Sequence, residues 1–152
     1  MRILAWIRHN LAHAVVASCS EAGCTLELDG LSDWVALKGE RIYADRRMCD
    51  RIVFAAHNGL LIGIVELKSK TVHADEVVDK LTNGTEAALE ISAQWANKQV
   101  SLHIYHLVLA QSWHPSQYRV ITTRKVSVRG KKYGILPQRC GVSFSQVISR
   151  FD

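Results

Sequence analysis

The stretch D-R-I-V-F-A-A-H-N-G-L-L-I-G-I-V-E-L-K, residues 50–68, decides the fold. Residues 50–56 and 60–68 are β-rich runs, and the His57-Asn58-Gly59 signal between them predicts a β-hairpin. Both runs are apolar on both faces, which is typical of strands in the middle of a sheet that is covered on each side. The centre of the fold is therefore expected to be this hairpin.

The length of the hairpin turn decides whether Asp50 and Glu66 share a face of the sheet. A turn of two residues would pair Asp50 with Leu67 and send its carboxylate to the other side. A turn of three residues, 57–59, with its glycine in the left-handed conformation, pairs Asp50 with Glu66. Lys68 shares the face of Glu66 because side chains alternate along a strand. We expect the three-residue turn, since it brings two carboxylates and an ammonium group together.

Two carboxylates at that separation repel each other unless a cation lies between them. Oxygen ligands with open coordination positions suit Mg²⁺ or Mn²⁺, which can polarise a phosphoryl oxygen and lower the pKa of bound water. Lys68 could orient or deprotonate that water and stabilise charge that develops on a phosphate. The alternative interpretation is a salt-bridged strand end, in which Lys68 pairs with Glu66 or Asp50 and no chemistry follows.

The other elements expected along the chain are a helix over 3–20, strands over 24–29 and 33–39, a helix over 74–96, a strand over 100–110, a short helix or loop near 115–122, a basic strand over 125–129, a Gly-rich turn region over 130–134 and an apolar segment over 142–151. Gly84 weakens the middle of the 74–96 helix, so two shorter helices remain an alternative there. The length of 152 residues fits one domain, with residues 111–152 as a basic C-terminal segment. This order predicts a mixed α/β fold, a sheet with helices packed on it.

Asp50 followed by Glu66-Leu67-Lys68 at the end of an apolar strand resembles the PD-(D/E)xK nuclease superfamily, the restriction-endonuclease-like fold. The resemblance covers about residues 3–110 and implies an αβββαβ core. It implies Mg²⁺-dependent hydrolysis of phosphodiester bonds, with Asp50, Glu66 and the Leu67 carbonyl as metal ligands. Lys68 would activate water, and Lys80, in the crossover helix, could contact the scissile phosphate or be a solvated lysine. Within the family an acid on the first helix sometimes adds to the site, and Glu21 is the only acid near that place.

Charge is distributed unevenly along the chain. Residues 1–90 carry ten Lys and Arg against thirteen Asp and Glu, whereas residues 91–151 carry nine Lys and Arg and no acid. Such a basic segment favours polyanions, so nucleic acid is the expected partner, DNA before RNA. Tyr133 and Trp113 are candidate platforms for stacking unpaired bases, but core packing is the favoured role for Trp113. The residues expected to contact phosphates are Arg119, Arg124, Lys125, Arg129, Lys131, Lys132 and Arg139.

Composition bounds the remaining possibilities. Apolar residues make up 48% and charged residues 22%, and the longest apolar run has six residues, so a disordered chain and a membrane span are not expected. Without a signal peptide, we expect a cytoplasmic protein whose four cysteines are reduced thiols. A homodimer, or a subunit of a larger complex, is possible. The different functional class is a non-catalytic nucleic-acid-binding or assembly module that keeps the nuclease fold.

Histidines give a weaker signal than the carboxylates. His9 and His13 are four residues apart, a spacing that can bind a metal on a helix, but no third ligand is evident. His57 and His73 lie near the expected site in sequence and are candidates to assist it. Ordinary polar or core histidines are the more common outcome for all of them.

Overall fold

A seven-stranded mixed sheet forms the centre of the computed structural model, which describes residues 1–68, 71–95 and 100–151. The strand order is β1-β4-β5-β6-β7-β9-β8; β6, β7 and β9 run parallel to one another, and all other neighbours are antiparallel. A separate pair, β2 and β3, forms a small antiparallel hairpin. The strands are β1 (Val15–Val16), β2 (Cys19–Glu21), β3 (Cys24–Leu26), β4 (Trp34–Lys38), β5 (Arg51–Ala56), β6 (Leu60–Lys68), β7 (Leu102–Ala110), β8 (Lys125–Val128) and β9 (Lys131–Arg139).

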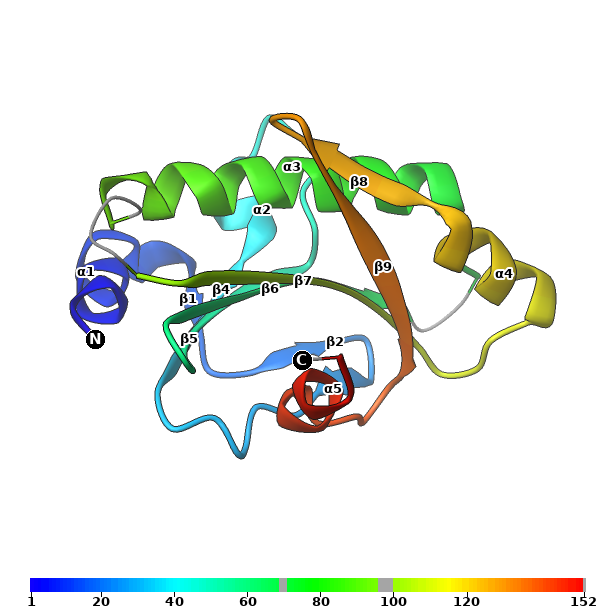
Figure 1. Ribbon diagram of the computed structural model, residues 1–152, viewed down its shortest axis with the longest axis horizontal. Coiled ribbons are helices and arrows are strands. Elements are labelled where there is room, and N and C mark those ends of the chain that lie inside the picture. Colours follow the sequence, from blue (N-terminus) through cyan, green and yellow to red (C-terminus); the bar gives the residue numbers. More distant parts are fainter. Residues whose placement is uncertain (69–70, 96–99, 152) are drawn as a thin grey trace.

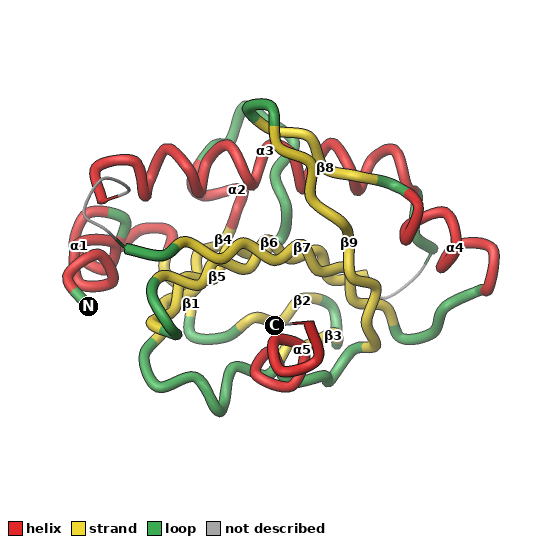
Figure 2. The backbone as a smooth tube through the Cα atoms, viewed as in Figure 1, coloured by secondary structure: helices red, strands yellow, loops and turns green. Residues whose placement is uncertain are grey.

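Helices cover both faces of the sheet, as Figures 1 and 2 show. The long helix α3 lies along one face, while α5 and the β2–β3 hairpin lie on the other (Figure 2). No helix among the described residues is long and apolar enough to cross a membrane. The helices are α1 (Arg2–Asn10), η1 (Ala12–Ala14), α2 (Gly39–Ile42), α3 (Ala74–Ser92), η2 (Ala93–Trp95), α4 (Pro115–Thr123) and α5 (Phe144–Phe151), where η marks a 3₁₀ helix.

The two apolar faces of β5 and β6 explain this layered arrangement. Side chains on one face, among them Phe54 and Ile64, pack in the core cluster beneath α1 and α3. Side chains on the other face, among them Val53 and Val65, pack with Phe144 of α5 in a second cluster. Strands that bury both faces need a layer on each side, so this three-layer mixed α/β fold follows from the hairpin sequence.

The first helix is much shorter than the expected span of 3–20. Helix α1 ends at Asn10, and the next residues form η1 and then β1, which pairs with β4 through Val15↔Leu37 and Val16↔Ala36. The two valines are β-branched and fit a pleated edge better than a helix. The helical spacing of apolar residues in this region was therefore a misleading signal beyond residue 10.

Helix α3 is continuous through Gly84, so the alternative of two shorter helices is wrong. Gly84 is buried where the helix crosses the sheet. A Cβ atom there would lie 2.5 Å from Cys49 Sγ and 3.0 Å from Ile64 Cγ2. The glycine thus permits a close approach of helix and sheet instead of breaking the helix.

The basic C-terminal segment is part of the main sheet. The expected Gly-rich turn region at 130–134 is wrong except at its start, because β9 begins at Lys131 and pairs in parallel with β7. Arg129 and Gly130, both with positive φ, make the turn instead. Residues 111–152 therefore contribute two strands and two helices to the same domain core.

Two of the four cysteines correct the expectation of reduced thiols. Cys24 and Cys140 form a disulfide bond that ties β3 to the residue after β9. Cys19 and Cys49 are free and buried, as expected of small apolar side chains. Cys24 and Cys140 are 116 residues apart, so no local pattern in the sequence indicated that they would meet.

Candidate active site

Asp50 and Glu66 meet at one end of the neighbouring strands β5 and β6, as the three-residue turn predicts. The pairs Ala56↔Leu60, Phe54↔Ile62 and Ile52↔Ile64 confirm that register, and the next opposed positions are 50 and 66. The Asp50 amide donates a hydrogen bond to Glu66 Oε1 (3.0 Å). The Leu67 amide in turn donates to Asp50 Oδ2 (2.7 Å). Each carboxylate is therefore held by the backbone of the opposite strand.

Glu66 is a buried acid with an incomplete set of partners. Its exposed fraction is 0%, and its Oε2 has no hydrogen-bond partner among the described residues. The nearest cations to this oxygen are Lys68 Nζ at 3.5 Å and Lys80 Nζ at 3.8 Å. Burial, and then the negative charge of Asp50, raise the pKa of Glu66 to about 7, although both lysines act in the opposite direction. The two lysines thus offset only part of the cost of burying the charged form of Glu66.

Lys80 projects from helix α3, so its ammonium group approaches the carboxylates from the helix layer and not from the sheet. Its ammonium group also contacts Glu76 Oε1 (3.2 Å), one helical turn earlier. Partial burial lowers the pKa of Lys80, but Glu66 and the hydrogen bond to Glu76 outweigh it, so the pKa is raised overall. Lys80 is therefore held as a cation between Glu66 and Glu76, so it is not a freely solvated lysine, and its contact with a phosphate stays a prediction.

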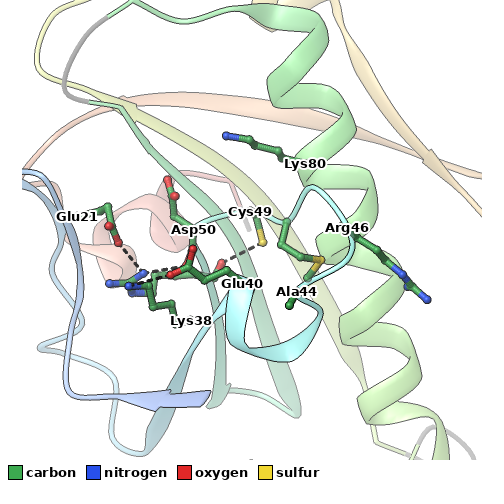
Figure 3. A pocket seen from close by; sticks show the side chains of 10 residues that line it. Glu21, Lys38, Glu40, Ala44, Arg46, Cys49, Asp50 and Lys80 are labelled. Atoms are coloured by element: carbon green, nitrogen blue, oxygen red, sulfur yellow. Dashed lines mark hydrogen bonds and ion pairs between the residues drawn. The ribbon is translucent and has the colours of Figure 1, made fainter. Parts of the chain in front are cut away.

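A cavity of about 320 Å³ opens beside the carboxylate pair. Figure 3 shows Asp50 at this cavity, with Lys80 on one side of it and Lys38 of β4 on the other. Arg46 is also at its wall, but its side chain runs away from Asp50 and stacks on the Tyr43 ring at 4.0 Å. The segment 38–50 thus lines one side of the site, a role that the sequence analysis did not assign to it.

Arg51 and Glu21 are the site residues that sequence reasoning missed or undervalued. Arg51 is buried, and its guanidinium donates to Glu21 Oε2 (2.9 Å), to the Asp50 carbonyl (2.9 Å) and to the Ser20 carbonyl (2.6 Å). These bonds fix the β2–β3 hairpin against the start of β5, and both residues line the cavity. The available signal was a charged residue inside an apolar strand, because a buried arginine needs several acceptors.

A divalent cation between Asp50 and Glu66 would offset the repulsion between the two acids. Glu66 Oε2 accepts no hydrogen bond from a described residue, although Lys68 and Lys80 lie at 3.5 and 3.8 Å from it. The protein would supply two carboxylates and leave other positions to backbone or water oxygens. Within residues 1–68, 71–95 and 100–151 there is no group of three or more His, Cys, Asp or Glu side chains with metal-binding geometry.

The basic residues of the C-terminal segment divide into two groups. Arg124 pairs with Asp75, and Arg129 pairs with Glu86 at 3.2 Å. The two acids are eleven residues apart on α3, a rise of about 16 Å at ~1.5 Å per residue. The five steps between the two arginines along β8 span about 16 Å at ~3.3 Å per residue. The matching lengths indicate that the two salt bridges connect β8 to α3, one at each end of the strand.

The remaining predicted phosphate contacts are exposed and form no ion pair with any described residue. Strand β8 alternates as expected, with Val126 and Val128 buried in the cluster that includes α3 and with Lys125 facing solvent. By register, Lys132 lies opposite Ser127 on that solvent face. The predicted contacts that are exposed and form no ion pair with a described residue are Arg119, Lys125, Lys131, Lys132 and Arg139.

Among the histidine and aromatic candidates, His57 is wrong as a residue that assists the site, whereas Trp113 packs against the core as expected. His57 lies in the β5–β6 turn, at the other end of β6 from Glu66, so it cannot assist the site. Tyr133 packs against the ring of His106 at 4.9 Å, and Trp113 donates its indole N–H to the Gln138 carbonyl (2.7 Å). Both aromatic residues are half-buried. The exposed aromatic next to them is Tyr118 of α4.

Comparison with family models, with curated proteins and with solved structures gave no match. The candidate site formed by Asp50, Glu66 and the two lysines beside them therefore rests on the geometry of this chain alone.

Proposed function

We propose that this protein is a metal-dependent nuclease that hydrolyses phosphodiester bonds, with DNA as its substrate. The observation that carries the proposal is the close pair of Asp50 and the buried Glu66, with two ammonium groups, at one end of strands β5 and β6. A buried acid with a raised pKa next to a second acid is uncommon as a purely structural feature, because it lowers stability. Such arrangements occur where a ligand or a reaction makes use of them.

Each residue has a role that follows from its position. Asp50 and Glu66 would hold Mg²⁺ or Mn²⁺ together with the Leu67 carbonyl, and the ion would polarise the phosphoryl oxygens and acidify bound water. Lys68, on the same face as Glu66, orients the attacking water as an ammonium donor, and the proton of the water passes to bulk solvent. Lys80 approaches from α3 and balances the charge that develops on the phosphate.

The order of elements supports the resemblance to the PD-(D/E)xK superfamily. Helix α1 precedes the antiparallel strands β4, β5 and β6, and α3 then crosses to the parallel strand β7. The carboxylate pair lies at the start of β5 and the end of β6. The exposed basic residues from Arg119 to Arg139 supply sequence-independent phosphate contacts.

The test is cleavage of plasmid and linear DNA in Mg²⁺, Mn²⁺ or EDTA by wild type and three variants. Glu66→Gln, Asp50→Asn and Lys68→Gln should each lower the cleavage rate by about 10²–10⁴-fold, the usual contribution of a positioned acid–base group. Asp29→Asn removes an exposed acid in the loop after β3 and should cleave like wild type. Equal cleavage by all proteins would mean a contaminating nuclease, and the proposal would fail.

Binding must be measured beside cleavage, because the alternative function uses the basic surface alone. Fluorescence anisotropy with labelled DNA in EDTA should give similar affinities for wild type and Lys68→Gln. DNA binding by wild type with no cleavage in either metal would identify a non-catalytic nucleic-acid-binding module instead.

A further inference from the structure

An unpaired arginine lies beside the carboxylate pair, on the same face of the sheet. Lys68 is opposite Ala110 of β7, and Ala110 is opposite Arg139 of β9, in parallel pairing. Directly opposed residues project from one face, so Arg139 shares the face of Lys68 and Glu66. Arg139 is exposed and pairs with no acid in residues 1–68, 71–95 and 100–151. Two strand spacings of ~4.8 Å place its Cα about 10 Å from that of Lys68.

Helix α4 follows β7 at this end of the sheet and packs against β9 (Figure 1). The indole N–H of Trp113 is bonded to the carbonyl of Gln138, the residue before Arg139. The ring of Tyr118 packs edge-to-face with that of Trp113, with the centroids 6.0 Å apart and an angle of 87° between the planes. Tyr118 is therefore held, through Trp113, at the end of β9.

Tyr118 is an exposed aromatic side chain among cations. It is 45% exposed in spite of its contact with the indole ring. Arg119, the next residue, is exposed and has no acidic partner in the described part of the chain. The acids in the first turn of the neighbouring helix α3, Asp75 and Glu76, are both in salt bridges. An exposed aromatic ring beside unpaired cations suits a nucleotide, because every base has a π-face and carries an anionic phosphate.

We propose that Tyr118 stacks on an unpaired base of the substrate strand, while Arg119 and Arg139 contact phosphates of the same strand. The inference rests on the proposed function, since it takes the ligand to be a nucleic acid. It adds that the preferred substrate is single-stranded where it passes α4. Bases inside a duplex are stacked on their neighbours, so a base must be unpaired to reach the ring.

Fluorescence anisotropy in EDTA, with a labelled 20-nucleotide single strand as the probe, tests the stacking. Tyr118→Leu removes the ring but keeps an apolar side chain against Trp113, and the dissociation constant should rise about 5- to 150-fold, which corresponds to ~1–3 kcal/mol for one stacked base. Tyr118→Phe keeps the ring and should bind within about twofold of wild type. Phe151→Ala is the matched control, because Phe151 is an aromatic residue of similar exposure (51%) on α5, and it should change nothing.

The dependence of binding on salt separates stacking from charge. Arg139→Gln removes one phosphate contact, so the slope of log K against log salt should become shallower by about 0.7 for the single strand. Tyr118→Leu should leave that slope unchanged. With the corresponding duplex, Tyr118→Leu should bind within about twofold of wild type, which also shows that the variant is folded.

Three results would overturn the proposal: a single-strand affinity that Tyr118→Leu leaves unchanged, an equal loss for single strand and duplex, or an equal loss in Phe151→Ala. Cleavage by wild type together with any of these results would leave the nuclease function standing. Tyr118-dependent binding of the single strand, without cleavage in Mg²⁺ or Mn²⁺, would leave the stacking assignment standing and remove the nuclease function.

Discussion

Removing the charge of Glu66 should make the protein more stable at alkaline pH, although the residue lies at the centre of the candidate site. The pKa of this carboxyl is about 7 in the folded chain, against 4.5 as its ordinary value. Between these two pH values the folded chain keeps a proton that the unfolded chain has released. The free energy of unfolding therefore falls as the pH rises through this window and reaches its full loss above about pH 7.

The size of the effect follows from the gap between the two pKa values. At about 1.4 kcal/mol for each pH unit, the loss is about 3 kcal/mol in the absence of a bound cation. Glu66→Gln cannot ionise and escapes this loss. Relative to wild type, the variant should therefore gain about 3 kcal/mol in stability between pH 4.5 and pH 8.

Urea unfolding in EDTA at a series of pH values measures this difference. The comparison between wild type and variant cancels the other titrating groups, which both proteins share. Glu40→Gln, which removes an exposed acid, should differ from wild type by less than about 0.5 kcal/mol at every pH. Adding Mg²⁺ at pH 8 should stabilise wild type and leave Glu66→Gln unchanged, because the ion binds the ionised carboxylate. A stability difference that stays constant from pH 4.5 to 8 would refute this reasoning.

Three further predictions concern the fold around the site. Gly84→Ala should destabilise the protein by about 1–2 kcal/mol in urea unfolding, because the added methyl group meets Cys49. This overpacking exceeds the gain in helix propensity, and a stabilised variant would show that α3 can move away from the sheet. The double variant Cys24→Ser with Cys140→Ser should lose about 2–5 kcal/mol and become insensitive to reductant, whereas wild type loses stability on reduction. Burial lowers the pKa of His106 to about 4 from 6.5, so wild type should lose up to about 3 kcal/mol as the pH falls through that window, and His106→Gln should not.

The hairpin could be predicted from local sequence alone. Two turn lengths remain open at that level, and the three-residue turn is preferred because it brings Asp50 opposite Glu66; the observed register agrees with that choice. Because both faces of β5 and β6 are apolar, burial alone does not choose between the two registers, and a slip would place Asp50 opposite Leu67. The hairpin thus follows from local sequence, whereas its register was selected by the charged residues at its open end.

The tertiary structure alone decided which distant groups surround that pair. Lys80 reaches Glu66 only because Gly84 lets α3 approach the sheet. Contacts between residues far apart in sequence depend on how layers pack, and no periodicity encodes that packing. For the same reason the sequence did not reveal the Cys24–Cys140 bond or the cavity lined by Lys38.

The basic C-terminal segment shows the same division. Its charge was evident from the sequence, as was the alternation that buries Val126 and Val128. Only the packing of β8 on α3 separates Arg124 and Arg129, which are held by acids of the helix, from the lysines that remain exposed. A charge count gives the sign of a surface, but its free cations depend on which acids the fold brings to them.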